Sequence, residues 1–116
     1  MTVADPAIQS ALLGDAIDSA PLAVLVADEA MRYVAVNQYA CEMLGYSREE
    51  LLSLRVTDVA TSPDAEQEYA EVLAHRRTEG VAVLRRRDGT VLSFRYRTGE
   101  TKVAGMAFYV AVGWPE

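Results

Sequence analysis

The sequence predicts an α+β domain in which helices cover one face of an antiparallel sheet. Two apolar strand segments precede a group of helical segments, and three further strand segments follow it. Strands and helices that gather in separate runs, instead of alternating, are typical of this fold class. The chain has 116 residues, of which 51% are hydrophobic, so it can bury one core but has no room for a second domain.

The first segment is predicted to form a helix that ends at about Ser19. Asp5 precedes Pro6 as an N-cap precedes a proline at the first helical position. Two apolar rows follow at helical spacing, formed by Ile8, Leu12 and Ala16 and by Leu13 and Ile17. We therefore divide the chain into a flanking helix (1–19) and a domain (20–116). The stripe is wide, so we expect the back of the sheet or a second copy of the helix to cover it.

The next two segments are predicted to pair as strands. Leu22–Ala27 is almost wholly apolar, which indicates a strand covered on both faces. The chain then turns at Asp28–Met31 and returns as Arg32–Val36.

Two short helices are then predicted to meet at one glycine. Asn37 is placed as the N-cap of the first, and Gly45 can end it in the left-handed conformation. Ser47 and Glu50 have the spacing of a capping box at the start of the second.

A polar loop (57–63) and a longer helix follow. Ser62 and Pro63 are predicted to start this helix, and Gly80 is predicted to end it. Its apolar face is formed by Ala65, Tyr69, Val72 and Leu73, with Glu66, Glu68 and Glu71 elsewhere.

The last three strands are predicted at Val81–Arg87, Thr90–Thr98 and Val103–Trp114, with a hairpin turn at Asp88–Gly89. The register of the first hairpin stays open. A two-residue turn would point Val81, Val83 and Arg85 inward, whereas a bulge at the glycine would point Ala82 and Leu84 inward. On the last strand the bulkier row is formed by Met106, Phe108, Val110 and Val112.

The order of these pieces resembles the PAS domain family, the sensory modules of histidine kinases and other regulators. The similarity rests on Asp28 after an apolar strand, Asn37 nine residues later, the helix start at 45–51 and the turn at 86–90. It extends roughly from Leu12 to Trp114. The resemblance implies the strand order 2-1-5-4-3, with the apolar first and last strands at the centre, and a role in signal transduction such as two-component regulation.

Charge and cysteine content restrict the partners and the compartment. The net charge of −6 disfavours nucleic acid. Five arginines gather on one hairpin, namely Arg85, Arg86, Arg87, Arg95 and Arg97. We interpret them as a solvated sheet edge; an acidic partner there would instead bind with strong salt dependence. Cys41 is the single cysteine, and no apolar run approaches the roughly 20 residues of a membrane span, so we expect a soluble cytoplasmic domain without membrane contact.

The residues do not suggest an enzyme or a metal site. The chain has one histidine and one cysteine, and it lacks a glycine-rich phosphate loop and any metal-ligand spacing. The serines have no partner other than His75, so a nucleophilic triad is not expected.

Neither haem nor flavin is expected as a cofactor. Some PAS domains hold haem through a histidine on the long helix, but the resemblance places that residue near Glu66 or Tyr69, and His75 lies on a flank. Light-oxygen-voltage domains use a cysteine that corresponds to Val56 here, whereas Cys41 lies in the preceding helix. The positions that would bind the flavin ring correspond to Leu84, Phe94 and Val112, which are apolar.

The remaining site is the space between the sheet and the helices. Its expected lining is Leu25, Ala27, Met43, Leu44, Tyr69, Leu73, Phe94, Tyr96, Met106 and Phe108. Apolar residues at such spacing usually pack as core, so a filled or small cavity is favoured. A ligand would need polar groups, which Tyr39, Tyr69, Tyr96 and Arg85 or Arg86 could supply.

The sequence thus predicts a non-catalytic PAS module that acts by homodimerisation, using the leading helix and the outer face of the sheet. Its output domain would lie outside this chain. The alternative is a small-molecule sensor whose cavity holds a small apolar metabolite.

Overall fold

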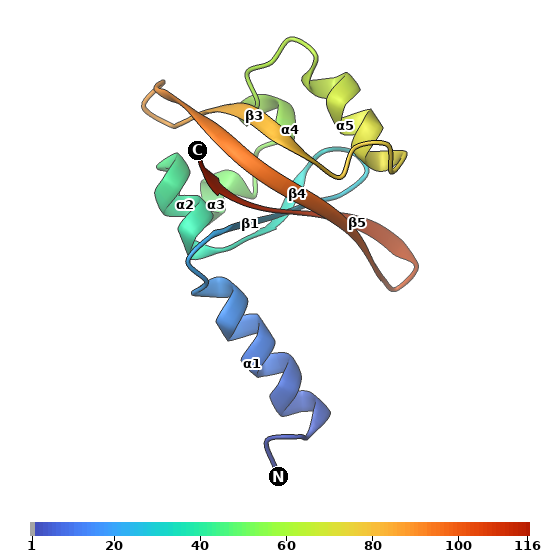
Figure 1. The fold of residues 1–116 in the computed structure, drawn as a ribbon. Helices are drawn as coiled ribbons and strands as arrows, with labels where there is room; N and C mark the ends of the chain where they lie inside the picture. The colour runs from blue at the N-terminus through green and yellow to red at the C-terminus, as the bar shows by residue number, and fades with distance from the viewer. Residues whose placement is uncertain (1) are drawn as a thin grey trace.

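The computed structural model describes residues 2–116 and contains one five-stranded antiparallel sheet (Figure 1). The strands are β1 (Ala23–Ala27), β2 (Tyr33–Val36), β3 (Glu79–Arg85), β4 (Val91–Val103) and β5 (Met106–Pro115). The helices are α1 (Pro6–Asp18), α2 (Gln38–Leu44), α3 (Arg48–Leu51), α4 (Val56–Val59) and α5 (Ala65–Leu73). The strand order is β2-β1-β5-β4-β3, so the predicted α+β fold and order are confirmed. No helix within residues 2–116 is long and apolar enough to span a bilayer.

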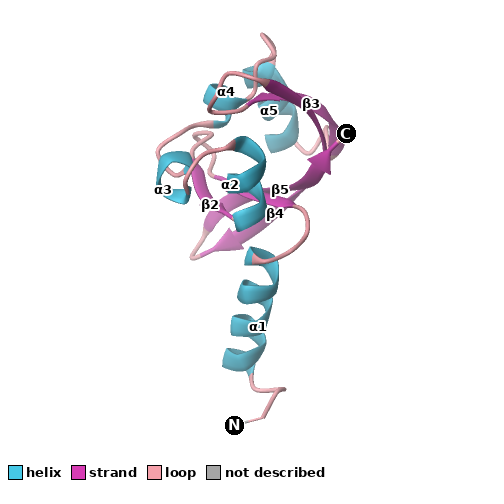
Figure 2. Ribbon diagram, turned by 90° about the vertical axis from the view of Figure 1, so that its left-hand side faces the viewer, coloured by secondary structure: helices cyan, strands magenta, loops and turns pink. Residues whose placement is uncertain are grey.

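Helix α1 projects away from the rest of the domain (Figures 1 and 2). The Asp5 side chain accepts a hydrogen bond from the backbone N–H of Ala7 at 2.9 Å, as an N-cap does. None of its residues is buried, and Leu12, Leu13 and Ile17 are 50%, 62% and 47% exposed. The predicted helix is present, but the back of the sheet does not cover it.

Asn37 joins three elements through one buried side chain. It is only 3% exposed, and its Oδ1 accepts from the N–H groups of Val24 (2.9 Å) and Ala40 (3.1 Å). Its Nδ2 donates to the carbonyls of Ile17 and Leu22, both at 2.9 Å. The amide thereby uses both donors and two acceptor positions. The predicted N-cap is confirmed, and the same group also ties the end of α1 to the start of β1.

The junction of α2 and α3 has the predicted caps. Gly45 has φ +79°, which a residue with a Cβ adopts at a cost. Ser47 Oγ accepts from the Glu50 N–H at 3.1 Å, and Glu50 Oε1 accepts from the Ser47 N–H at 3.0 Å. That backbone hydrogen bond is the main reason why the pKa of the Glu50 carboxyl lies below its usual value.

The arginine-rich hairpin packs on the end of α2. The backbone N–H of Arg87 donates to the Leu44 carbonyl at 2.9 Å, and Arg86 Nε donates to the Met43 carbonyl at 3.2 Å. Arg87 Nε also pairs with Glu50 Oε2 at 2.8 Å. These donors satisfy carbonyls that a helix end leaves free. The interpretation of a solvated edge is wrong for Arg86, whose side chain contacts the helix end, whereas the Arg87 side chain is 62% exposed. Two exposed ion pairs involve other members of the cluster, Arg95 with Glu116 and Arg97 with Glu79.

The predicted loop at 57–63 contains an additional helix, α4. Its start is held by the Arg55 N–H, which donates to Asp58 Oδ2 at 2.8 Å, and its last residue, Val59, is fully buried. Asp64, not Ser62, occupies the N-cap position of α5. The Ser62 Oγ accepts a hydrogen bond from the Asp64 N–H at 3.2 Å. Only Val56 and Val59 of the four-residue helix α4 pack against the core, and two residues leave no periodicity in the sequence to detect.

Helix α5 is shorter than predicted. His75 adopts φ +58°, and the Arg76 N–H donates to the Glu71 carbonyl at 2.8 Å, which closes a Schellman motif. The expectation that Gly80 ends the helix is wrong, because Gly80 lies in β3 opposite Tyr96. A Cβ on Gly80 would come within 2.9 Å of the Tyr96 hydroxyl, so packing explains this glycine.

The sequence left the register of the β3–β4 hairpin open, and the structure has the register with the bulge. Leu84 pairs with Leu92 and Ala82 pairs with Phe94, so both β3 residues face the helices. Gly89 has φ +89°, as the bulge position requires. The β4–β5 hairpin is longer than expected and turns at Ala104–Gly105, where both φ angles are positive.

The Asn37 network predicts a large loss of stability on truncation. Asn37→Ala should lower the free energy of unfolding by about 2–4 kcal/mol, because it leaves buried backbone groups without partners. Ser47→Ala removes a cap at an exposed position and should cost only about 1 kcal/mol. Denaturant melts measure both. Equal losses in the free energy of unfolding for the two variants would mean that Asn37 contributes to stability only as a helix cap.

Candidate functional site

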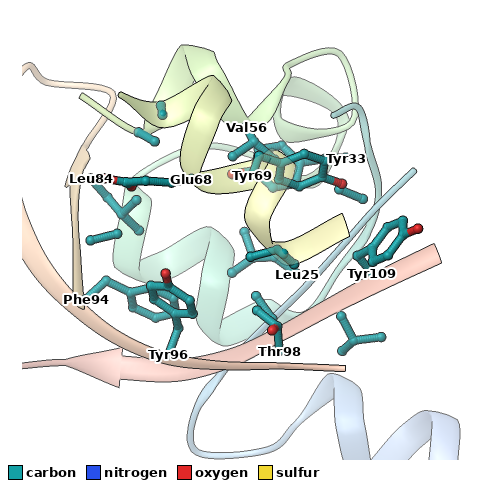
Figure 3. A pocket seen from close by; sticks show the side chains of 17 residues that line it. Leu25, Tyr33, Val56, Glu68, Tyr69, Leu84, Phe94, Tyr96, Thr98 and Tyr109 are labelled. Carbon is teal, nitrogen blue, oxygen red and sulfur yellow. The ribbon is translucent and has the colours of Figure 1, made fainter. Parts of the chain in front are cut away.

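A cavity of about 110 Å³ lies between the sheet and helices α4 and α5 (Figure 3). Its walls come from the inward positions of the sheet and from the buried sides of the two helices. Five residues of the expected lining border it, namely Leu25, Ala27, Tyr69, Phe94 and Tyr96.

Three other residues of the expected lining lie in the core beside the cavity. Leu44 is fully buried, whereas Met43 and Leu73 are partly buried and pack against the core. None of the three borders the cavity.

Met106 and Phe108 were expected in the lining, and the structure corrects this. Tyr109 pairs with Ala27, which faces the helices, so its strand neighbour Phe108 points to the outer face, as does Met106 two residues before. Apart from Tyr109, the inner row of β5 is small, and at Gly113 the reason is steric. A Cβ on Gly113 would meet the Arg95 carbonyl oxygen at 2.0 Å. The bulkier row therefore faces outward.

Several lining residues escaped the sequence reasoning. The main ones are Tyr33, Val56, Glu68, Thr98 and Tyr109. Glu68 was assigned to the polar side of its helix, yet it lies four residues before Val72, on the same side of α5. That spacing was the available signal, because both residues border the cavity.

Two buried tyrosines carry polar atoms at the cavity. The Tyr69 hydroxyl donates to the Asp28 carbonyl at 2.6 Å, and burial, followed by the charge of Asp28, raises its pKa. Burial also raises the pKa of Tyr33, with further contributions from Tyr69 and Asp58. Both side chains are therefore neutral phenols that can form hydrogen bonds at any physiological pH.

The other polar candidates lie elsewhere, except Tyr96, which borders the cavity. Tyr39 packs against the core, Arg85 is exposed on β3, and Arg86 contacts the end of α2.

The residues present do not fit haem or flavin. His75 has a side chain that is 64% exposed, and its Nε2 lies 2.7 Å from Glu100 Oε2, away from the cavity. Cys41 does not border the cavity either, and burial raises the pKa of its thiol. Val56 borders it at the position where the resemblance places the flavin-reactive cysteine. The cavity is also smaller than the roughly 300 Å³ at which typical ligand pockets begin.

A comparison with family models identifies the chain. The model described as "PAS domain" matches residues 21–105. The chain therefore belongs to the PAS domain family. PAS domains are in general sensory modules without catalysis. None of the curated proteins compared with the chain matches it.

Solved structures share this fold at low sequence identity. The PAS domain of an HTR-like protein from Haloarcula marismortui is 22% identical, with a TM-score of 0.82 over 93% of this chain and 92% of that chain. A PAS domain from a two-component sensor histidine kinase is 18% identical, with a TM-score of 0.84 over 95% and 98%. An RNA-binding light-oxygen-voltage receptor is 16% identical, with a TM-score of 0.82 over 99% of this chain and 35% of that chain.

Within residues 2–116, no group of three or more His, Cys, Asp or Glu side chains could hold a metal ion.

The purified protein is expected to be colourless, because the side chains that would hold haem or flavin are not at the cavity. An absorbance scan of protein purified without added cofactor is the measurement. A band in the haem Soret region or near the flavin maximum would contradict the assignment of Val56 and His75.

Proposed function

We propose that this PAS domain is a non-catalytic cytoplasmic signalling module that acts by homodimerisation through α1 and the outer face of the sheet. It would transmit its signal to an output domain outside this chain. The similarity of its fold to a PAS domain of a two-component sensor histidine kinase supports a role of this kind.

The observation that carries the proposal is the apolar outer face of β1 and β5. Val24 pairs with Val112 and Val26 pairs with Val110 on this face. Further along β5, Met106 and Trp114 are 57% and 45% exposed. A contiguous apolar surface of this kind typically marks an interaction site.

Helix α1 adds a second apolar surface. Leu13, at 62% exposed, is the most exposed of its large apolar side chains, and the helix is anchored at its C-terminal end by the Ile17 carbonyl bonded to Asn37. A two-fold symmetric dimer would bury the same patch on both copies, which favours a self-complementary apolar surface.

Removing residues 1–16 should weaken the dimer while leaving the fold intact, because this truncation keeps the Ile17 carbonyl that Asn37 needs. Phe108→Ser should weaken it as well, since its side chain leaves the outer face. Thr101→Ser is the matched control, because Thr101 is the cross-strand partner of Phe108. Sedimentation of all four proteins measures association. A full-length monomer at every concentration, or a truncated chain that dimerises as well as the full chain, would contradict the proposal.

The second candidate function is a small-molecule sensor with a ligand in the cavity. The space of about 110 Å³ beneath α5 favours it, because a core filled by its own side chains would leave none. Native mass spectrometry of the purified chain tests it. A reproducible added mass that is lost on denaturation is the expected result, and the bare chain mass alone would count against a retained ligand.

A further inference from the structure

The cavity collects most of the aromatic side chains of the protein. The chain has nine aromatic residues, six Tyr, two Phe and one Trp. Five border the cavity, namely Tyr33, Tyr69, Phe94, Tyr96 and Tyr109. They approach it from β2, α5, β4 and β5 (Figure 3). The face of an aromatic ring carries negative charge density and attracts cations.

These rings form two contacting pairs. Phe94 and Tyr96 are stacked with their centroids 6.4 Å apart, and Tyr69 meets Tyr109 edge-on at 6.2 Å. Contacts between rings restrict their rotamers, so the aromatic surface exists before a ligand arrives. A preformed wall reduces the entropy that binding would otherwise cost.

The charged groups around the cavity are mostly acidic. Among the described residues that line the cavity, Glu68 is the only charged one. Burial is the largest cause of the raised pKa of three lining tyrosines, Tyr33, Tyr69 and Tyr109. Neighbouring tyrosines and carboxylates raise it further, and the carboxylates are Asp58 for Tyr33, Asp28 and Glu29 for Tyr69, and Glu100 and Glu29 for Tyr109.

The basic side chains close by are already paired with carboxylates, Arg77 with Glu71, and His75 and Lys102 with Glu100. Arg77 has a raised pKa because of hydrogen bonds to Glu71 and then to Tyr96. Its Nε lies 3.0 Å from Glu71 Oε2, and it does not border the cavity. Glu68 Oε1 accepts only a weak bond from the Ser62 hydroxyl, at 3.3 Å. The Glu68 carboxylate thus has no basic side chain within ion-pair distance among the described residues.

We propose that the cavity binds a small monovalent organic cation of the alkylammonium class, with Glu68 as the countercharge and the aromatic rings around its alkyl groups. This rests on the second candidate function, the sensor. An anion would meet only like charge there, and a neutral molecule of the same shape would lose the attraction to Glu68 and to the ring faces. The volume of about 110 Å³ limits the ligand to about four or five non-hydrogen atoms, because a cavity of ~150 Å³ holds the six of benzene.

Three probes of similar shape and different charge test the proposal on the full chain. Tetramethylammonium is the cation, tert-butanol the neutral analogue and methanesulfonate the anion; each has five non-hydrogen atoms and is titrated to high millimolar concentration. Chemical shifts of methyl groups that border the cavity, such as those of Ala27 and Val56, report binding. Sodium chloride and sodium sulfate at equal ionic strength correct for salt. Tetramethylammonium is expected to bind at least tenfold more tightly than tert-butanol, and methanesulfonate is expected not to bind.

Glu68→Gln keeps the size of the side chain and removes its charge, so it should weaken tetramethylammonium binding about tenfold and leave tert-butanol binding unchanged. Unchanged tert-butanol binding also shows that the variant is folded. The matched control is Glu66→Gln, because Glu66 lies on the same helix but is exposed and does not border the cavity.

The outcomes separate this proposal from the sensor function on which it rests. If tert-butanol binds as tightly as tetramethylammonium, or if Glu68→Gln behaves like Glu66→Gln, the cation proposal is overturned and a sensor of apolar molecules remains. If methanesulfonate binds best, the assigned charge preference is wrong. If no probe binds, both the cation proposal and the sensor function fail.

Discussion

The rest of the structure depends on the buried carboxamide of Asn37. A buried amide is tolerated only when its hydrogen bonds are satisfied, and here four partners on three elements satisfy it. Those bonds fix the end of α1 and the start of α2 against β1, which lies between β2 and β5 in the sheet. The base of α1 and the strand that carries Leu25 and Ala27 therefore share one anchor.

The cavity exists because small residues and a short helix lie above the centre of the sheet. Ala111 and Gly113 are two of the inward residues of β5 next to β1, beside Tyr109, and Ala82 occupies an inward position of β3. Helix α5 buries only Ala65 and Tyr69 before the left-handed His75 ends it. Large side chains are thus scarce directly beneath α5, and aromatic rings from neighbouring positions form the walls instead.

The two proposed interaction surfaces lie on opposite faces of the same strands. Along β1, Leu25 and Ala27 border the cavity, while Val24 and Val26 alternate with them toward the apolar outer face. A ligand inside and a partner copy outside would therefore contact adjacent residues of one strand. In this arrangement, a ligand that displaced β1 would also move the residues of its outer face, without any intermediate element.

Local signals in the sequence determined the element types, the caps at Asn37, Gly45 and Ser47, and the antiparallel α+β class, because each depends on residues a few positions apart. The same signals left the register of β3 open and assigned the wrong row of β5 to the cavity. Both rows of β5 are apolar, so pattern alone cannot choose between them. Tertiary structure decides, because only the smaller row fits where Gly113 passes the backbone of β4 at Arg95. From the sequence, Glu68 is likewise predicted to be a surface residue, whereas the packing of α5 places it at the cavity.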